Sequence, residues 1–168
     1  LGRVSYQPRS FSITLSMLGS RERFNQMRDE LGNQYAGKLC EVVLSEEPDL
    51  YAVGTLELEP SYDPLTGKGQ MVLSCSDGDA YRYHIEETEI AMTGGGTLIL
   101  VNDYMPVIPT VLTTAETALS WNIGEDVFKK SVSAGIWTFP ELELQAGQNT
   151  VRITGTGTTT FRYREGRL

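Results

Sequence analysis

Apolar and polar side chains alternate along the first part of the chain, which is the pattern of strands that bury one face. In residues 10–18 the apolar side chains all fall on one side: Phe11, Ile13, Leu15 and Met17. Similar runs between polar turns predict further strands, in residues 38–45, 50–59, 70–76 and 81–85. We therefore expect the first part of the chain to be built around a sheet.

One segment has an apolar spacing of three and four instead. Phe24, Met27 and Leu31 form a stripe on one side of a helix, and Ser20 is placed to cap its N-terminus. The following Gly32-Asn33 pair predicts the end of the helix. Because the stripe is narrow, we expect the helix to pack on an edge or a face of the sheet.

Only short strand-like runs follow residue 92. They are separated by Gly, Pro, Asn or Asp, and they lie at residues 97–101, 107–112, 118–123, 127–132, 136–139, 142–144, 151–154 and 158–163. Residues 142–144 and 151–153 flank a turn at 146–149, which predicts a β-hairpin followed by a closing strand. The regular spacing predicts a compact β-sandwich or jelly roll.

Three consecutive glycines, at residues 94–96, separate the two parts of the chain. They lack the spacing of a phosphate-binding loop and do not open a helix, so a hinge or domain boundary is the better interpretation. The charge changes at the same place: residues 1–92 carry 8 Lys or Arg against 15 Asp or Glu, and residues 93–168 carry 6 against 7. We expect an α+β domain at 1–92 and a β-sandwich at 93–168.

The composition agrees with a mostly β protein. Gly accounts for 17 of 168 residues, and the 8 Tyr outnumber the 5 Phe and 2 Trp, which favours short strands with tight turns over long helices. The net charge of −8 argues against specific nucleic-acid binding, since an acidic surface repels phosphates. The sequence contains no run of about 18 apolar residues, so we expect no membrane insertion.

Residue types that carry catalysis or bind metals are scarce. His84 is the only histidine, and no CxxC, HExxH or GxSxG pattern accompanies it. Cys40 and Cys75 fit two buried thiols, with a disulfide as the alternative. We expect no catalytic residue, no metal site and no cofactor, and therefore no enzyme.

Three aromatic residues leave two interpretations open. Trp121, Trp137 and Tyr104 could form a platform that stacks on sugar rings, or they could contact protein in the core or at a subunit interface. Trp121 is in phase with Leu119 and Ile123, which favours the core for it, whereas Trp137 fits either role. These three are the candidate contact residues for sugar or protein.

Four local patterns, taken in order, resemble one protein family. Residues 6–13 hold a Pro-Arg lead into the first strand, and residues 45–53 an acidic Pro-Asp turn before a Tyr-containing strand. Residues 71–83 form a strand followed by a tyrosine pair. The closing region, residues 102–168, contains Asn-Asp, two prolines, AGQNTVRITG and FRYREGRL. Together they resemble the distal tail proteins of long-tailed phages, the Dit family, which often lie in prophages of Gram-positive bacteria. The likeness covers nearly the whole chain.

The resemblance implies a structural hub without catalysis. The first domains would form a hexameric ring around the tail channel, and the second, galectin-like β-sandwich domains would project outward. The ring would join the tail tube protein to a tail-tip protein of the tail-associated lysin type, and it could carry receptor-binding proteins. The implied location is the tip of the virion tail, after assembly in the cytoplasm of the bacterial host.

One departure from the family concerns the start of the chain. Family members usually carry additional strands before the Pro-Arg segment, whereas this sequence begins at Leu1 without Met. We therefore expect the first domain to lack these N-terminal strands. The alternative function is a non-catalytic carbohydrate-binding β-sandwich module, which would use an exposed aromatic platform.

Overall fold

A computed structural model describes residues 6–168; residues 1–5, where the sequence begins without Met, lie outside the described part. Residues 6–168 form one α-helix and fifteen β-strands. The expectation of a mostly β protein is therefore confirmed. The chain divides into two compact units, the first ending at Arg82 and the second beginning at Tyr83.

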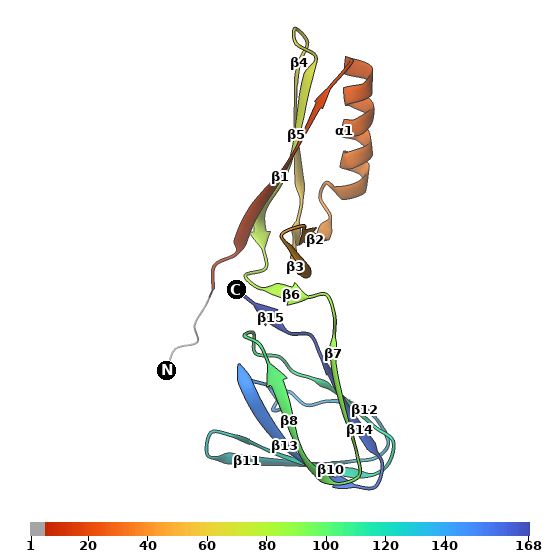
Figure 1. The fold of residues 1–168 in the computed structure, drawn as a ribbon, viewed down its shortest axis with the longest axis vertical. Coiled ribbons are helices and arrows are strands. Elements are labelled where there is room, and N and C mark those ends of the chain that lie inside the picture. The colour runs from red at the N-terminus through yellow and green to blue at the C-terminus, as the bar shows by residue number, and fades with distance from the viewer. Residues whose placement is uncertain (1–5) are drawn as a thin grey trace. The chain divides into compact units, whose positions relative to one another are not determined.

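The first unit combines a sheet, a helix and a hairpin. Its elements are β1 (Arg9–Leu18), α1 (Arg21–Tyr35), β2 (Leu39–Leu44), β3 (Glu47–Thr55), β4 (Glu57–Asp63) and β5 (Lys68–Gly78). Strands β1, β5 and β4 form an antiparallel sheet in that order, and β2 pairs with β3. α1 runs alongside the sheet (Figure 1). The buried side chains of β5 are those that alternate along one face, namely Met71, Leu73 and Cys75.

The helix begins where the sequence predicted. The Ser20 side-chain oxygen accepts a hydrogen bond from the Arg23 backbone N–H at 3.3 Å, which satisfies one of the free N–H groups of the first turn. Phe24 is buried, and its ring centre lies 5.0 Å from the ring centre of Tyr62 on β4. The predicted apolar stripe thus packs on a face of the sheet.

The predicted stop at Gly32 and Asn33 is wrong, because the helix continues to Tyr35. Lys38 Nζ donates a hydrogen bond to the Asn33 carbonyl at 2.8 Å and so satisfies a carbonyl near the helix end. A Cβ on Gly32 would lie 3.7 Å from the Leu58 side chain on β4. An added Cβ would therefore make only an ordinary van der Waals contact, and the glycine does not end the helix.

The strand predicted at residues 50–59 is two strands. β3 ends at Thr55 and β4 begins at Glu57, and the chain passes from the hairpin to the sheet through the buried Leu56. Residues 60–69 form the end of a long hairpin, because β4 and β5 continue to Asp63 and Lys68, which are paired.

The second unit is a β-sandwich, as predicted. Its strands after β6 (Arg82–His84), which lies at the division between the units, are β7 (Thr88–Thr93), β8 (Gly96–Asn102), β9 (Thr110–Thr113), β10 (Thr117–Ile123), β11 (Asp126–Val132), β12 (Gly135–Thr138), β13 (Gly147–Gly155), β14 (Thr158–Tyr163) and β15 (Gly166–Arg167). Two antiparallel sheets have the strand orders β11-β10-β13-β8 and β12-β9-β14-β7.

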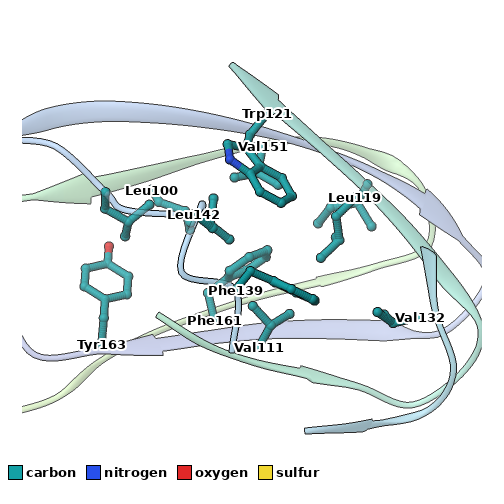
Figure 2. Close-up of a cluster of buried hydrophobic side chains, with 12 residues drawn as sticks. Leu100, Val111, Leu119, Trp121, Val132, Phe139, Leu142, Val151, Phe161 and Tyr163 are labelled. Carbon is teal, nitrogen blue, oxygen red and sulfur yellow. The ribbon is translucent and has the colours of Figure 1, made fainter. Parts of the chain in front are cut away.

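The core of the second unit lies between these two sheets. Figure 2 shows Trp121 and Val151 facing Phe161 and Val111 across the sandwich, with Phe139 between them. Val111, Val151 and Phe161 are completely buried. Apolar burial of this kind contributes about 1.5–3 kcal/mol for each large side chain, so the second unit has a core of its own.

The β-hairpin predicted near the end of the chain is wrong. Residues 142–144 are not a strand: Leu144 makes only an isolated bridge, with Val107. β13 begins at Gly147, inside the predicted turn, and it pairs with β8 and β10. The short Leu-Glu-Leu alternation arises because Leu142 and Leu144 are both buried in the sandwich core.

The division between the units lies at residue 82, and the sequence placed it at residue 92. β7 belongs to the sandwich, since Thr93 pairs with Thr158 on β14. Gly94 and Gly95 form the turn between β7 and β8, where Gly94 has a φ of +80°. The conformational freedom of Gly94 is used within the sandwich, because this φ is costly for other residues.

Candidate interaction surfaces

α1 covers only part of the apolar face of the first sheet. Phe24 packs so closely over Gly69 on β5 that a Cβ on Gly69 would overlap its ring. β1 lies on the other side of β5, and there Leu15 remains 37 % exposed on the face that carries the helix. Leu18, at the end of β1, is 70 % exposed. The first unit thus presents apolar side chains along β1.

Both outer strands of this sheet have an unpaired edge within the described residues. β1 (10 residues) and β4 (7 residues) each pair with the central strand β5, and the sheet of residues 6–168 continues on neither side. The N–H and C=O groups of such an edge can pair with a strand of another chain. The two edges differ in sequence and length, so they are two different surfaces.

An apolar side chain also marks the tip of the β4–β5 hairpin. Leu65 is 94 % exposed, and the turn that carries it is held by Asp63, which accepts hydrogen bonds from Leu65 N at 2.9 Å and Thr66 Oγ1 at 2.6 Å. The hydrogen bond from Thr66, followed by that from Leu65, lowers the pKa of the Asp63 carboxyl. Other exposed apolar side chains of this unit lie on the β2–β3 hairpin: Leu39, Val43 and Leu44.

In the second unit a polar cluster secures the last strand. Asp103 Oδ2 lies 3.1 Å from His84 Nε2 and 2.8 Å from Arg167 Nε. Burial raises the pKa of the Asp103 carboxyl, but the His84 hydrogen bond and the Arg167 charge outweigh burial, and the pKa is lowered overall. The Tyr104 backbone N–H also donates to the Gly166 carbonyl, at 3.2 Å. His84 therefore has a structural role, joining β6 to the loop after β8.

A cleft opens on the second unit where two neighbouring strands separate. β10 and β13 pair only as far as Trp121 and Val151. The space between their ends has a volume of about 670 Å³, and the loop Leu142–Gln145 forms part of its lining. No local sequence pattern predicts this cleft, because it depends on strands that are remote in the chain.

The three aromatic residues singled out in the sequence lie in different environments. Trp121 is 4 % exposed and donates from Nε1 to the Glu141 carbonyl at 3.0 Å, so its predicted core position is confirmed. Trp137 on β12 is half-buried and donates to the Ser133 carbonyl at 3.1 Å. Tyr104 is 58 % exposed, in the loop after β8. Only Tyr104 therefore has a largely accessible ring for stacking.

Within residues 6–168, no three His, Cys, Asp or Glu side chains are grouped to hold a metal ion. Cys75 is buried and Cys40 half-buried, and both are free thiols. The described residues include no helix that is both long and apolar enough to span a membrane.

Known proteins provide a counterpart for this fold. No protein-family model matches the chain, and no curated protein matches its sequence. Among solved structures, the crystal structure of the Dit protein of phage SPP1 matches with a TM-score of 0.69 and 14 % sequence identity, over 98 % of this chain and 81 % of that one. This chain has the fold of a phage Dit protein.

The Dit fold extends over both units, since the match covers nearly the whole chain. The SPP1 Dit protein is described as a paradigm of the hub adsorption apparatus in phages that infect Gram-positive bacteria. The resemblance to distal tail proteins that the sequence motifs indicated is thus confirmed at the level of the fold. At 14 % identity the two chains share the fold and few of the residues themselves.

Proposed function

We propose that this protein is a subunit of a phage tail hub, in which copies of the chain form a ring that joins the tail tube to the proteins of the tail tip. The Dit fold supports this proposal most directly, because the SPP1 counterpart belongs to a hub adsorption apparatus. The protein acts by shape and contact, without catalysis. Its place is the tip of the virion tail, and it is assembled in the cytoplasm of the bacterial host.

The two free sheet edges favour self-association through the first unit. β1 of one copy pairs with β4 of the next, and such a contact between two different surfaces repeats around an axis until it closes a ring. Six copies is the number that the resemblance implies. Leu15 and Leu18 on the β1 side are then covered by the neighbouring copy, which removes apolar surface from water.

The other surfaces receive different tail proteins. A ring has two faces, and in this proposal one contacts the tail tube protein and the other a tail-tip protein of the tail-associated lysin type. The second unit exposes Ile99 and Val101 on β8 at the border of the sandwich. Exposed apolar side chains on an edge strand fit the docking of a receptor-binding protein.

Light scattering during size-exclusion chromatography tests ring assembly. The 168-residue chain is expected to elute as a hexamer or a multiple of it. The variants Leu15→Glu and Leu18→Glu place a charge on β1 and should shift the protein to the monomer. The control Ile136→Glu changes a side chain of the second unit that is as accessible as Leu18, 71 % exposed, and should leave the ring intact.

Two results would count against the proposal. One is a strict monomer of the unmodified chain at high protein concentration. The other is an assembly that the control variant Ile136→Glu abolishes while both β1 variants preserve it, because the contact would then lie in the second unit.

A further inference from the structure

The cleft between β10 and β13 is an opening in the hydrogen-bond ladder of the sandwich. Beyond Trp121 and Val151, the end of β10 pairs only with β11, and the start of β13 pairs only with β8. Asn122 and Ile123 therefore lie on one wall, and Gln148 lies on the other. Such a fork leaves a concave space, lined by both polar and apolar side chains, in an otherwise regular sheet.

The loop Leu142–Gln145, which lines part of the cleft, is held in place at both of its ends. Trp121 Nε1 donates to the Glu141 carbonyl at 3.0 Å, just before the loop Leu142–Gln145. At the other end of the loop, the Asn149 side chain accepts from Gln145 N at 2.8 Å and donates to Gln145 O at 2.7 Å. Because its lining is fixed by the fold, the cleft can bind without first ordering a loop, which lowers the entropic cost of binding.

The side chains that line the cleft offer donors and acceptors in balance. The lining carries amide, hydroxyl, carboxylate and guanidinium groups, on Asn122, Gln145, Gln148, Ser120, Thr97, Thr150, Glu143 and Arg152. The single carboxylate and the single guanidinium give a net charge of zero. Gln145 Nε2 donates to Glu143 Oε2 at 3.1 Å and orients that carboxylate.

A row of three side chains crosses the sheet beside the cleft. The strand register places Arg152 between Ser120 on β10 and Thr97 on β8. A guanidinium flanked by hydroxyls can donate two parallel hydrogen bonds to a pair of neighbouring oxygen atoms. Ile123, which is partly exposed, supplies an apolar surface for a C–H face.

We propose that this cleft binds a neutral saccharide. Sugars present neighbouring hydroxyl groups that both donate and accept hydrogen bonds. A neutral sugar has no charge of the kind by which Arg152 would attract a phosphate or a carboxylate. The zero net charge of the lining and its mixture of amides and hydroxyls fit such a ligand better than a lipid or a nucleotide. The binding function goes beyond ring assembly, which does not need this cleft.

The proposed site differs from an aromatic sugar platform. Trp121 contributes only to the wall of the cleft, because its ring is buried in the core. Contacts would come mainly from hydrogen bonds by Asn122, Gln148 and Arg152. An extended peptide could in principle pair with the open strand ends. The polar side chains that line the cleft favour a ligand rich in hydroxyl groups.

A glycan array probed with the full 168-residue chain, followed by calorimetry with the best neutral oligosaccharide, tests the proposal. The variants Asn122→Ala, Gln148→Ala and Arg152→Ala are expected to bind about tenfold more weakly, because each removes hydrogen bonds to the ligand. The matched controls Asn25→Ala and Arg23→Ala, both on α1, should bind like the unmodified chain. Circular dichroism of each variant checks that the sandwich is folded.

Three results would overturn the saccharide site. These are no binding of any neutral oligosaccharide at about 1 mM, binding that is unchanged in all three folded cleft variants, and binding of extended peptides alone. The ring variant Leu18→Glu separates this proposal from ring assembly, since it is expected to lose the ring and keep sugar binding.

Discussion

Gly54 and Cys75 pack directly against each other where β3 approaches β5: a Cβ on Gly54 would overlap the Cys75 sulfur. The thiol is buried, and a Cβ on Gly54 would also come within 3.0 Å of the Gly78 backbone. The first unit therefore depends on the absence of a side chain at residue 54.

We expect Gly54→Ala to destabilise the first unit by about 1–3 kcal/mol, because the added methyl group overpacks this contact. Urea unfolding followed by circular dichroism measures the change. Gly32→Ala is the matched control: its Cβ would meet Leu58 at an ordinary 3.7 Å inside a helix, so it should stabilise by up to about 1 kcal/mol. Equal effects of the two substitutions would contradict the overlap at Cys75.

Removing Phe161 from the centre of the sandwich should have a larger effect. The side chain is completely buried between the two sheets, so Phe161→Ala is expected to cost about 3–5 kcal/mol in the second unit. Thermal unfolding with calorimetry would record it. Ile136→Ala, at a side chain that is 71 % exposed, should change stability by less than about 0.5 kcal/mol. A small effect of Phe161→Ala would mean that the two sheets are not packed as described.

Tyr163 links stability to alkaline pH. Burial, together with the Glu165 charge, raises the pKa of Tyr163 from 10.0 to about 12. Its hydroxyl donates a hydrogen bond to the Val101 carbonyl. The unfolded chain releases this proton near pH 10 and the folded chain near pH 12. Between these values the folded state binds more protons, so stability falls as the pH rises.

The stabilisation from Tyr163 is expected to be complete below pH 10 and to decline by roughly 2–3 kcal/mol up to about pH 12. Urea unfolding at a series of alkaline pH values measures this decline. Tyr163→Phe should be less stable at neutral pH by about 1 kcal/mol and should lose the pH dependence that comes from this group. An unchanged alkaline profile in the variant would show that another group controls it.

Asp103 should have the opposite dependence, at acid pH. Its folded pKa is lowered below the ordinary 3.8 by His84 and Arg167, so the stabilisation is present above about pH 4 and is lost as the pH falls through the folded value. We expect Asp103→Asn to reduce stability at neutral pH and to flatten the loss below pH 4. Unfolding midpoints between pH 2 and 7 test this, and a variant that keeps the full acid sensitivity would exclude Asp103 as its source.

Local signals in the sequence were sufficient for local features. Ser20 capped the helix as predicted, because a cap depends only on residues within one turn. Trp121 was placed in the core from its phase with Leu119, since alternation within one strand determines which side chains face inward. The strand β14, at Thr158–Tyr163, was found with its observed bounds for the same reason.

Features that depend on distant parts of the chain were missed. The Leu142–Leu144 segment alternates like a strand, but its partner is Val107 and its leucines fill the end of a core. Gly32 is typical of a helix stop, but the helix continues to Tyr35 on the face of the sheet. The cleft between β10 and β13 follows from two strand registers together, and no short motif encodes a register.

The two unlike edges of the first sheet give any ring built through them a direction of growth. A copy added at the β1 edge of a partial ring offers its own β1 edge to the next copy, and the β4 edge stays at the starting end. A copy with one blocked edge would therefore end the assembly that it joins, and each such copy would prevent one ring from closing. Mixtures of two variants, each blocked at a different edge, would form only pairs.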